Sequence, residues 1–553
     1  MIVEKLTPWQ RFMGLLALER KDIVQIAYYA VFSGIVALSL PLGIQAIVNL
    51  IQGAQISTSW IVLVVLVTVG VVFVGILNFM QLRIIETLQQ RIFVKASFEL
   101  SYRFPKIKME ELRNQYPPEL ANRFFDTLSI QKGLSKVLID FPAALLQIIF
   151  ALILLSFYNT LFIVFGIVLL SAVFLVFQYT ARKGLETSLI ESKFKYKVAH
   201  WIQEIARSII SFKLSGNTNL ALLKNDALVE NYLKARESHF RVVKLQYIKM
   251  IGFKAIVTAG ILIIGGVLVL NQKMNIGQFV AAEIMILLVI SSIEKLILGL
   301  ETFYDMLTSI EKLGQVVDKE LESQEGEKIN LEDGLSLELD DITYSVPNRE
   351  KPILKNISLK LHPKSRILVQ GVSGSGKSSL LRIISGVISP TVGNIYVNGF
   401  SIKGLYINHY RRHLGLSLSE EFPFKGTLRE NLTFGDEAIT DKVIIETLSN
   451  IGLSGFLKEL PQGLNTIIFP EGKQISYTIA KKIVLARAIL KQPKLLILED
   501  ALDQFSEAET KSVIDYLCKP TNPWALIIVS SEDYWKEYCK ELLLFKEGQI
   551  QAI

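Results

Sequence analysis

Cysteine is nearly absent from this sequence, and its scarcity excludes two kinds of protein. Only Cys518 and Cys539 occur among the 553 residues. Two such distant residues provide neither a disulfide framework nor the spacing of a zinc site. We therefore interpret both as inert thiols of a reducing compartment and set redox and zinc chemistry aside.

A basic stripe interleaved with aromatic side chains is also missing. The net charge of +7 and the pI near 9.0 would indicate a nucleic-acid partner if the basic residues were gathered in such a stripe. Cytoplasmic loops of membrane proteins carry the same excess of lysine and arginine. The sequence therefore favours a membrane protein with no nucleic-acid partner.

Long apolar stretches are abundant. Half of the residues are hydrophobic and the mean hydropathy is +0.38, which is too apolar for a purely soluble chain. About 20 apolar residues in a helix cross a bilayer. Six stretches of this kind predict six transmembrane helices in contact with lipid: 24–50, 58–82, 138–159, 161–181, 250–271 and 277–300.

The segments between these stretches indicate the topology. Short loops join the stretches in pairs, whereas the long intervening segments, 83–136 and 182–249, are basic and mostly helical in pattern. By the positive-inside bias we expect these long segments and both termini to face the cytoplasm. Residues 1–22 lack the pattern of a cleaved signal peptide and predict an interfacial amphipathic helix. The transmembrane helices are expected to continue into the cytoplasm as long arms.

Three ionisable residues within the predicted spans attract attention. Lys254 and Glu294 lie near the cytoplasmic ends of the fifth and sixth spans, where snorkelling or a mutual ion pair would satisfy them. Glu283 lies deeper in the sixth span. A carboxylate at such a depth faces a protein interior or a water-filled cavity, so Glu283 is a candidate cavity-lining residue.

A change of composition divides the chain into domains. Residues 312–334 are charged and short of large apolar side chains, as is typical of a linker. We predict a multidomain protein with an interfacial helix at 1–22, a six-helix α-helical transmembrane bundle at 23–311, this linker, and a soluble α/β P-loop NTPase domain at 335–553.

The soluble domain contains a phosphate-binding loop. The strand-like run from Ile367 leads into "GVSGSGKS", and a helical pattern follows, which is the context that such a loop requires. Its glycines allow backbone N–H groups to surround an anion, Lys377 reaches the terminal phosphates, and Ser378 can ligate magnesium. The residues assigned to nucleotide binding are Gly371, Val372, Ser373, Gly374, Ser375, Gly376, Lys377, Ser378 and Ser379. ATP and Mg²⁺ are the expected cofactors.

With these motifs the chain resembles a half-transporter of the ATP-binding cassette (ABC) exporter class over nearly its whole length. The phrases that carry the resemblance include "KPILKNISLKL", "GTLRENLTFG", "LARAILKQPKLLIL" and "LLLFKEGQI". The stretch "PPELANRFFDTLSIQKGLSKVLIDF" resembles the first cytoplasmic arm of bacterial type I secretion and peptide exporters. This resemblance implies a dimer, homodimeric or heterodimeric, in the bacterial inner membrane, with ATP-driven alternating access and, for secretion, a periplasmic adaptor.

The resemblance also assigns roles to the two acids that end the apolar run "LLIL". In the family pattern the first acid, here Glu499, holds magnesium through water, and the second, here Asp500, polarises the attacking water. The family order is Asp-Glu, whereas this chain has Glu-Asp. Each carboxylate is therefore displaced by about one methylene, and a displacement on the order of 1 Å can reduce a rate about 100-fold. We expect hydrolysis to suffer more than binding.

Several other positions depart from the family pattern. The signature stretch corresponds to Ile475–Ile479, which keeps Ser476 but replaces both glycines by tyrosine and threonine. The expected adenine-stacking aromatic is Val346, for which Tyr344 is a poor substitute. Serine replaces three further polar residues: the magnesium-sensing glutamine at Ser419, the aspartate at Ser506 and the histidine at Ser531.

Two functions therefore stay open at this point. The first is an exporter subunit that couples ATP binding and slow hydrolysis to the export of a peptide, a protein or a hydrophobic compound. The second is a subunit that binds nucleotide without turnover and acts as a regulatory or partner subunit of a cassette transporter. The departures impair the site built on Lys377 in either case.

Overall fold

The computed structural model describes residues 6–52, 58–113, 115–347 and 349–551. The chain divides into two compact units. The helical unit comprises Met1–Lys106 and Asn114–Lys319, and the α/β unit comprises Ile107–Arg113 and Glu320–Ile553. The chain therefore passes from one unit to the other at three points.

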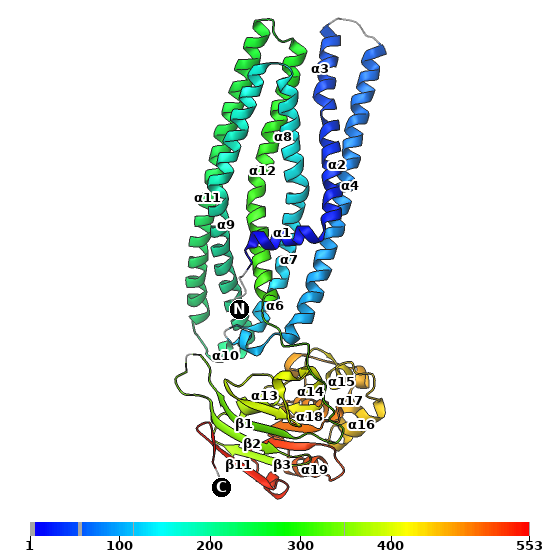
Figure 1. The fold of residues 1–553 in the computed structure, drawn as a ribbon, viewed down its shortest axis with the longest axis vertical. Helices are drawn as coiled ribbons and strands as arrows, with labels where there is room; N and C mark the ends of the chain where they lie inside the picture. Colours follow the sequence, from blue (N-terminus) through cyan, green and yellow to red (C-terminus); the bar gives the residue numbers. More distant parts are fainter. Residues whose placement is uncertain (1–5, 53–57, 114, 348, 552–553) are drawn as a thin grey trace. The chain divides into compact units, whose positions relative to one another are not determined.

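Helices, several of them long, make up the helical unit (Figure 1). They are α1 (Pro8–Leu18), α2 (Arg20–Ala37), α3 (Ser39–Gln52), α4 (Thr58–Arg103), α6 (Pro117–Asn122), α7 (Asp126–Ser135), α8 (Phe141–Ser156), α9 (Thr160–Arg207), α10 (Ile209–Leu214), α11 (Leu220–Leu270) and α12 (Ile276–Val317). Short 3₁₀ turns at Phe104–Lys106 and Arg123–Phe125 and a π turn at Lys136–Asp140 connect some of them.

These helices account for the predicted spans. Five helical segments of the described chain are long and apolar enough to cross a membrane, and a sixth apolar segment, Thr160–Ser171, begins α9. Because each predicted stretch falls on one of them, the six-helix prediction is confirmed in outline. The loop that was predicted between the first and second spans lies partly at 53–57, outside the described residues.

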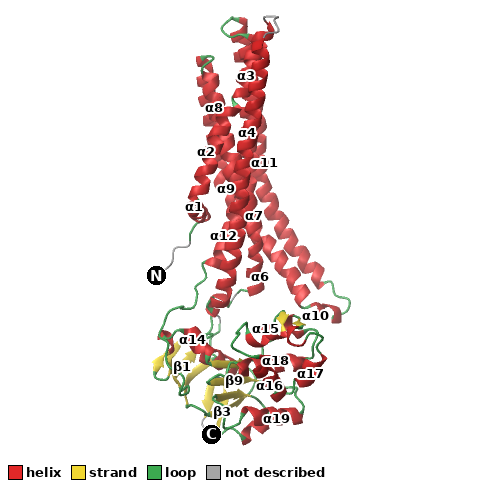
Figure 2. Cartoon of the chain, turned by 90° about the vertical axis from the view of Figure 1, so that its right-hand side faces the viewer, coloured by secondary structure: helices red, strands yellow, loops and turns green. Residues whose placement is uncertain are grey.

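Four of the helices are far longer than a bilayer requires (Figure 2). α4, α9, α11 and α12 contain 46, 48, 51 and 42 residues. Since about 20 residues cross the hydrocarbon, each helix has about 20 or more residues to spare. The prediction that transmembrane helices continue as long arms is confirmed for these four.

Helix α12 lies at the centre of the helical unit. Its buried face packs with α8, α9 and α11 in one apolar core, and Gly299 provides the space that the Phe141 ring occupies. Lys254 Nζ on α11 donates to the Glu294 carboxylate at 2.5 Å, which confirms the ion-pair alternative for these two residues. Glu283 on α12 is exposed. Its assignment to a cavity stays a prediction.

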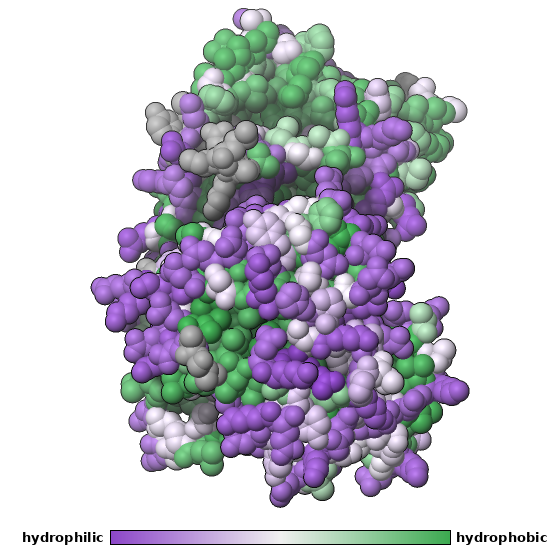
Figure 3. Space-filling model, turned by 60° about the horizontal axis from the view of Figure 1, so that its bottom comes forward, coloured by the Kyte–Doolittle hydropathy of each residue, from purple (hydrophilic) through white to green (hydrophobic). Residues whose placement is uncertain are grey.

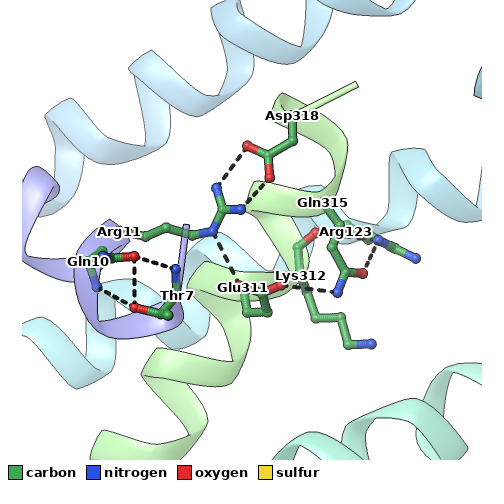
Figure 4. Close-up of polar contacts among 8 residues, drawn as sticks. All are labelled: Thr7, Gln10, Arg11, Arg123, Glu311, Lys312, Gln315 and Asp318. Atoms are coloured by element: carbon green, nitrogen blue, oxygen red, sulfur yellow. Dashed lines mark hydrogen bonds and ion pairs between the residues drawn. The ribbon is translucent and has the colours of Figure 1, made fainter. Parts of the chain in front are cut away.

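Helix α1 is fixed to α12 by ionic contacts (Figure 4). It begins with a capping box in which the Thr7 side chain accepts from the Gln10 backbone and Gln10 accepts in return, satisfying donors that a helix end leaves free. One turn later, Arg11 donates to Glu311 at 3.2 Å and forms a bidentate pair with Asp318. These contacts hold α1 across the end of the long helix.

Two principal sheets form the α/β unit. The first, in the order β2-β1-β4-β5, consists of β1 (Leu337–Tyr344), β2 (Leu354–Leu361), β4 (Val392–Val397) and β5 (Phe400–Ser401). The second, in the order β12-β11-β3-β10-β9-β6, consists of β3 (Arg366–Gly371), β6 (Leu414–Ser417), β9 (Leu495–Glu499), β10 (Ala525–Val529), β11 (Glu541–Lys546) and β12 (Gln549–Gln551). A two-stranded ribbon pairs β7 (Gly426–Thr427) with β8 (Ile467–Ile468).

Helices surround these sheets. They are α5 (Met109–Leu112), α13 (Lys377–Ile384), α14 (Ile407–Arg412), α15 (Leu428–Thr433), α16 (Asp441–Asn450), α17 (Ser454–Glu459), α18 (Tyr477–Leu490) and α19 (Glu507–Leu517). β9 and β10 are buried along their whole length, as expected for parallel strands covered on both faces. The surface of this unit visible in Figure 3 is mostly hydrophilic, around a hydrophobic area.

Candidate functional site

Four neighbouring parallel strands end at the same edge of the second sheet. β3, β10, β9 and β6 are adjacent, and Val529 pairs with both Val369 and Glu499. The phosphate-binding loop follows β3, and the two acids stand at the end of β9. Because ligands of open α/β sheets bind outside the carboxyl ends of the strands, this edge is the candidate site.

The phosphate-binding loop has a backbone that glycine alone adopts easily. Gly371, Gly374 and Gly376 have φ angles of +154°, +78° and +104°. A Cβ atom on Gly376 would also lie 2.8 Å from the Ile353 carbonyl oxygen. The loop therefore depends on these glycines, and α13 begins directly after it, at Lys377.

The polar groups of the loop are arranged for an anion. Lys377 Nζ donates to the carbonyl oxygens of Gly371 and Val372 at 2.7 and 3.0 Å, so the ammonium lies over the loop. The Ser375 hydroxyl is buried without a hydrogen-bond partner among the described residues. A phosphate would provide that partner and would attract the ammonium. The loop therefore fits a nucleotide phosphate.

The two acids have different environments. Glu499 is buried, and its Oε2 atom accepts from the backbone N–H and the hydroxyl of Ser419 at 3.3 and 3.1 Å. Asp500 is half-buried, with a φ of +47°. Burial raises the pKa of Asp500 to about 6, and the nearby Asp503 and Glu499 carboxylates add to the rise. At neutral pH Asp500 is therefore mostly ionised and close to its titration.

Ser419 contacts Glu499 through its backbone N–H and its side-chain hydroxyl. In the family pattern this position holds the magnesium-sensing glutamine, whose side chain is longer than that of serine. In the structure the shorter side chain at position 419 meets the longer carboxylate at position 499, and the two form a hydrogen-bonded pair. The two departures from the family pattern thus contact each other in the folded chain.

The residues around the loop fit magnesium only in part. Ser378 lies in the first turn of α13, and one oxygen of Glu499 is already shared by the two donors of Ser419. Among the described residues, no group of three metal-ligating side chains could hold an ion by itself. Ser378 and Glu499 would therefore hold the ion together with the nucleotide phosphates, where magnesium would neutralise phosphate charge.

The signature residue Ser476 serves its own helix. It is the N-cap of α18, and its hydroxyl accepts from the Ile479 N–H at 3.2 Å. Tyr477 is 43% exposed at the first helical position, and the Thr478 hydroxyl donates to the Gln504 carbonyl at 3.3 Å. The Tyr477 side chain thus occupies a position where the family pattern has glycine. It lies at the N-terminus of α18, where the Ile479 N–H already donates to the Ser476 hydroxyl.

Three other departures have clear structural settings. Tyr344 is buried in the core of the α/β unit, and its hydroxyl accepts from Arg113 at 3.3 Å, so its ring is not available to stack on a base. Ser506 is the N-cap of α19 in a capping box with Glu509, a role that serine and aspartate fill equally well. Ser531 follows β10 at the same edge as the acids.

The sequence did not identify Lys481 as a site residue. It lies on α18, is 1% exposed, and donates to three carbonyl oxygens of the loop that contains Ser419. The available signal was the pair Lys481-Lys482 within an otherwise apolar helical pattern. Lysine is almost never fully buried without partners.

Comparisons with known proteins agree with this arrangement. A protein-family model described as ABC transporter matches residues 354–503. The ABC multidrug transporter MDR2 of Trichophyton interdigitale (strain MR816) is 30% identical over 206 residues, which are 36% of this chain and 15% of that protein. The ABC multidrug transporter atrD of Emericella nidulans is 31% identical over 199 residues, or 35% of this chain and 15% of that protein. The chain thus spans only a small part of the length of these curated relatives.

The whole chain has a counterpart among solved structures. A bacterial Atm1-family ABC exporter with ATP bound matches it with a TM-score of 0.86, at 15% sequence identity. The match covers 97% of this chain and 95% of that one. Both units therefore share the fold of that exporter.

Proposed function

Because the chain is a half-transporter of the ATP-binding cassette exporter class, with that family's cassette at residues 354–503 and an exporter fold over its length, we propose that it binds ATP and couples it to export. The observation that carries the proposal is the loop geometry. The Lys377 ammonium lies over the loop, within hydrogen-bond distance of the Gly371 and Val372 carbonyl oxygens, and the buried Ser375 hydroxyl has no hydrogen-bond partner among the described residues.

We propose that hydrolysis at this site is slow. The Glu499 carboxylate is hydrogen-bonded to Ser419, and Asp500 carries its carboxyl one methylene closer to the backbone than a glutamate would. Displacements on the order of 1 Å can cost about 100-fold in rate. Asp500 remains the candidate base, since a pKa of about 6 leaves it mostly ionised at pH 7.

The subunit is proposed to act in a dimer, embedded in membrane lipid. In the exporter class each site joins one subunit's phosphate loop to the partner's signature helix. Opposite a second copy, Lys377 would face the capped helix end at Ser476 and the Tyr477 side chain. Opposite a different half-transporter, it would face that partner's signature helix. Homodimer and heterodimer are distinguished by whether the purified chain forms a nucleotide-binding dimer alone.

The alternative is a nucleotide-binding partner subunit without turnover. The capped signature helix favours it, because Ile479 N–H already donates to Ser476 and is less available to a partner's phosphate. The cargo of either transporter would be a peptide, a protein or a hydrophobic compound. We propose the bacterial inner membrane as its location, with cytoplasmic termini and, for secretion, a periplasmic adaptor.

The deciding experiment measures ATP binding and phosphate release by the full chain in lipid nanodiscs. Phosphate release that Lys377→Ala abolishes would establish an ATPase. ATP binding that Lys377→Ala abolishes, with release at the level of empty nanodiscs, would establish the alternative. ATP binding that is absent, or unchanged by Lys377→Ala, would refute the proposed site.

A further inference from the structure

A buried ammonium group lies beside the acids of the site. Lys481 is on the second turn of α18 and is almost fully buried. Its Nζ atom donates to the carbonyl oxygens of Ser419, Glu421 and Leu418 at 2.5, 3.2 and 3.4 Å. All three donors of the ammonium are therefore used, and residues 418–421 wrap around it.

Two aromatic rings complete this enclosure. Lys481 Nζ lies 4.7 Å from the centroid of the Phe422 ring and 5.4 Å from that of the Tyr477 ring. The two rings contact each other edge to face at 6.0 Å. Ring faces attract a cation, so Tyr477 and Phe422 shield the ammonium from water and help to keep it in place.

Among the residues that the structure describes, none forms a direct ion pair with Lys481. Its hydrogen-bond acceptors are neutral carbonyl groups. Burial lowers its pKa, whereas four nearby acids act in the opposite direction: Glu421, Glu499, Asp500 and Asp503. Glu421 is itself paired with Arg487 at 3.0 Å. Besides Glu421, the positive charge of Lys481 therefore acts on Glu499, Asp500 and Asp503, the three acids at the candidate site.

Lys481 is also linked to Glu499 through Ser419. The Ser419 carbonyl accepts from Lys481, while the N–H and hydroxyl of Ser419 donate to Glu499. One residue thus connects the ammonium to the carboxylate. Hydrogen bonds within the protein therefore hold Ser419 and Glu499 together, without a metal ion.

We propose that Lys481 is a positioning residue whose fixed charge, with its clamp on Ser419, lets the site bind ATP without a divalent cation. The inference rests on the proposed nucleotide binding and concerns its dependence on metal. Three carboxylates around a phosphate site repel an incoming nucleotide, and a nearby cation reduces that repulsion. Magnesium would add to this effect and would not be required for binding.

Lys482 provides a matched control. It is the next residue of the same helix and is 4% exposed. Its ammonium, however, forms an ion pair with the Glu509 carboxylate at 2.6 Å, which neutralises the charge of Lys482 locally. Lys482→Gln and Lys481→Gln remove the same charge from neighbouring buried positions, and only the second removes the clamp on Ser419.

The test measures the dissociation constant of radiolabelled ATP for the full chain in nanodiscs, with saturating magnesium and with excess EDTA. We expect the unmodified chain to bind with constants that differ by less than about threefold between the two conditions. Lys481→Gln should weaken binding in EDTA by about tenfold or more, while magnesium restores most of the affinity. Lys482→Gln should resemble the unmodified chain.

Three results would overturn the inference. The first is that the unmodified chain requires magnesium for binding. The second is that Lys481→Gln and Lys482→Gln weaken binding equally. The third is that Lys481→Gln abolishes binding in both conditions, which would assign Lys481 to the fold and not to the charge balance. A chain that binds no ATP in either condition would instead refute the proposed function itself.

Discussion

Asp500 should make the α/β unit less stable as the pH rises, and Asp500→Asn should remove this effect. The carboxyl titrates near pH 6 in the folded chain and at about 4 in the unfolded one. Between these values the unfolded chain releases a proton that the folded chain retains. The free energy of unfolding therefore falls as the pH rises from about 4 to about 6 and stays lower above that range. Asparagine cannot ionise, and it tolerates the positive φ of this position.

The expected magnitude follows from the shift. A rise of about two pKa units corresponds to about 3 kcal/mol, and because Asp500 is only half-buried, solvent screening reduces this to about 1–2 kcal/mol. Asp500→Asn should thus raise the melting temperature of the α/β unit by about 2–8 °C at pH 7.5. At pH 4 the two proteins should melt together.

Trp524 and Trp535 are buried in the α/β unit, whereas Trp9, Trp60 and Trp201 lie in the helical unit. With these three replaced by phenylalanine in every variant, tryptophan fluorescence reports the thermal unfolding of the α/β unit in the full chain. Asp340→Asn, at an exposed position of β1, controls for the loss of one surface charge. Titration of Asp500 is not the cause if Asp500→Asn and the unmodified chain show the same pH dependence of the melting temperature, or if Asp340→Asn stabilises the protein as much.

Three further predictions concern the departures from the family pattern. The triple variant Glu499→Asp, Asp500→Glu and Ser419→Gln should raise the rate of phosphate release by about 10–100-fold. The exchange of the two acids alone should raise it less, because a shorter acid at position 499 loses contact with Ser419. Equal rates for the two variants would show that positions 419 and 499 are not coupled. Tyr344→Phe should change ATP affinity by less than about twofold, because the ring is buried and contributes one neutral hydrogen bond; a larger loss in ATP binding would place this ring against the base. Ser506→Ala should lower the free energy of unfolding by about 1 kcal/mol without altering ATP affinity, as measured by denaturant titration and by binding; unchanged stability would exclude the capping role.

Much of the fold could be predicted from local patterns in the sequence. Apolar runs of about 20 residues located the helices that are long enough to span a bilayer, because lipid requires such runs. The phosphate-binding loop could be placed between a strand and a helix, because glycine spacing and hydrophobic pattern agree there. Both features depend on residues that are close in sequence.

Contacts between distant segments could not be predicted in this way. Ser419 and Glu499 are 80 residues apart, and Ser419 and Lys481 are 62 residues apart. In the sequence, the serine at position 419 and the glutamate at position 499 each suggested a lost function. In the folded chain, Ser419 is hydrogen-bonded to both Glu499 and Lys481. A single sequence does not indicate which two departures meet. The boundaries drawn at 311 and 334 and the roles assigned to Asp500 and Ser476 stay predictions.

The inclusion of Ile107–Arg113 and Glu320–Gly334 in the α/β unit has a practical consequence for fragment design. Arg411 forms a bidentate pair with Glu322 at 2.6 and 2.9 Å, and Glu110 accepts from the Ser389 N–H at 2.9 Å. A recombinant fragment of the α/β unit starting at residue 335 would lack the Glu322 and Glu110 carboxylates and the Arg113 guanidinium that contacts Tyr344. Such a fragment would behave as a multiple mutant of the native unit, and its stability and affinities would not transfer to the intact transporter subunit.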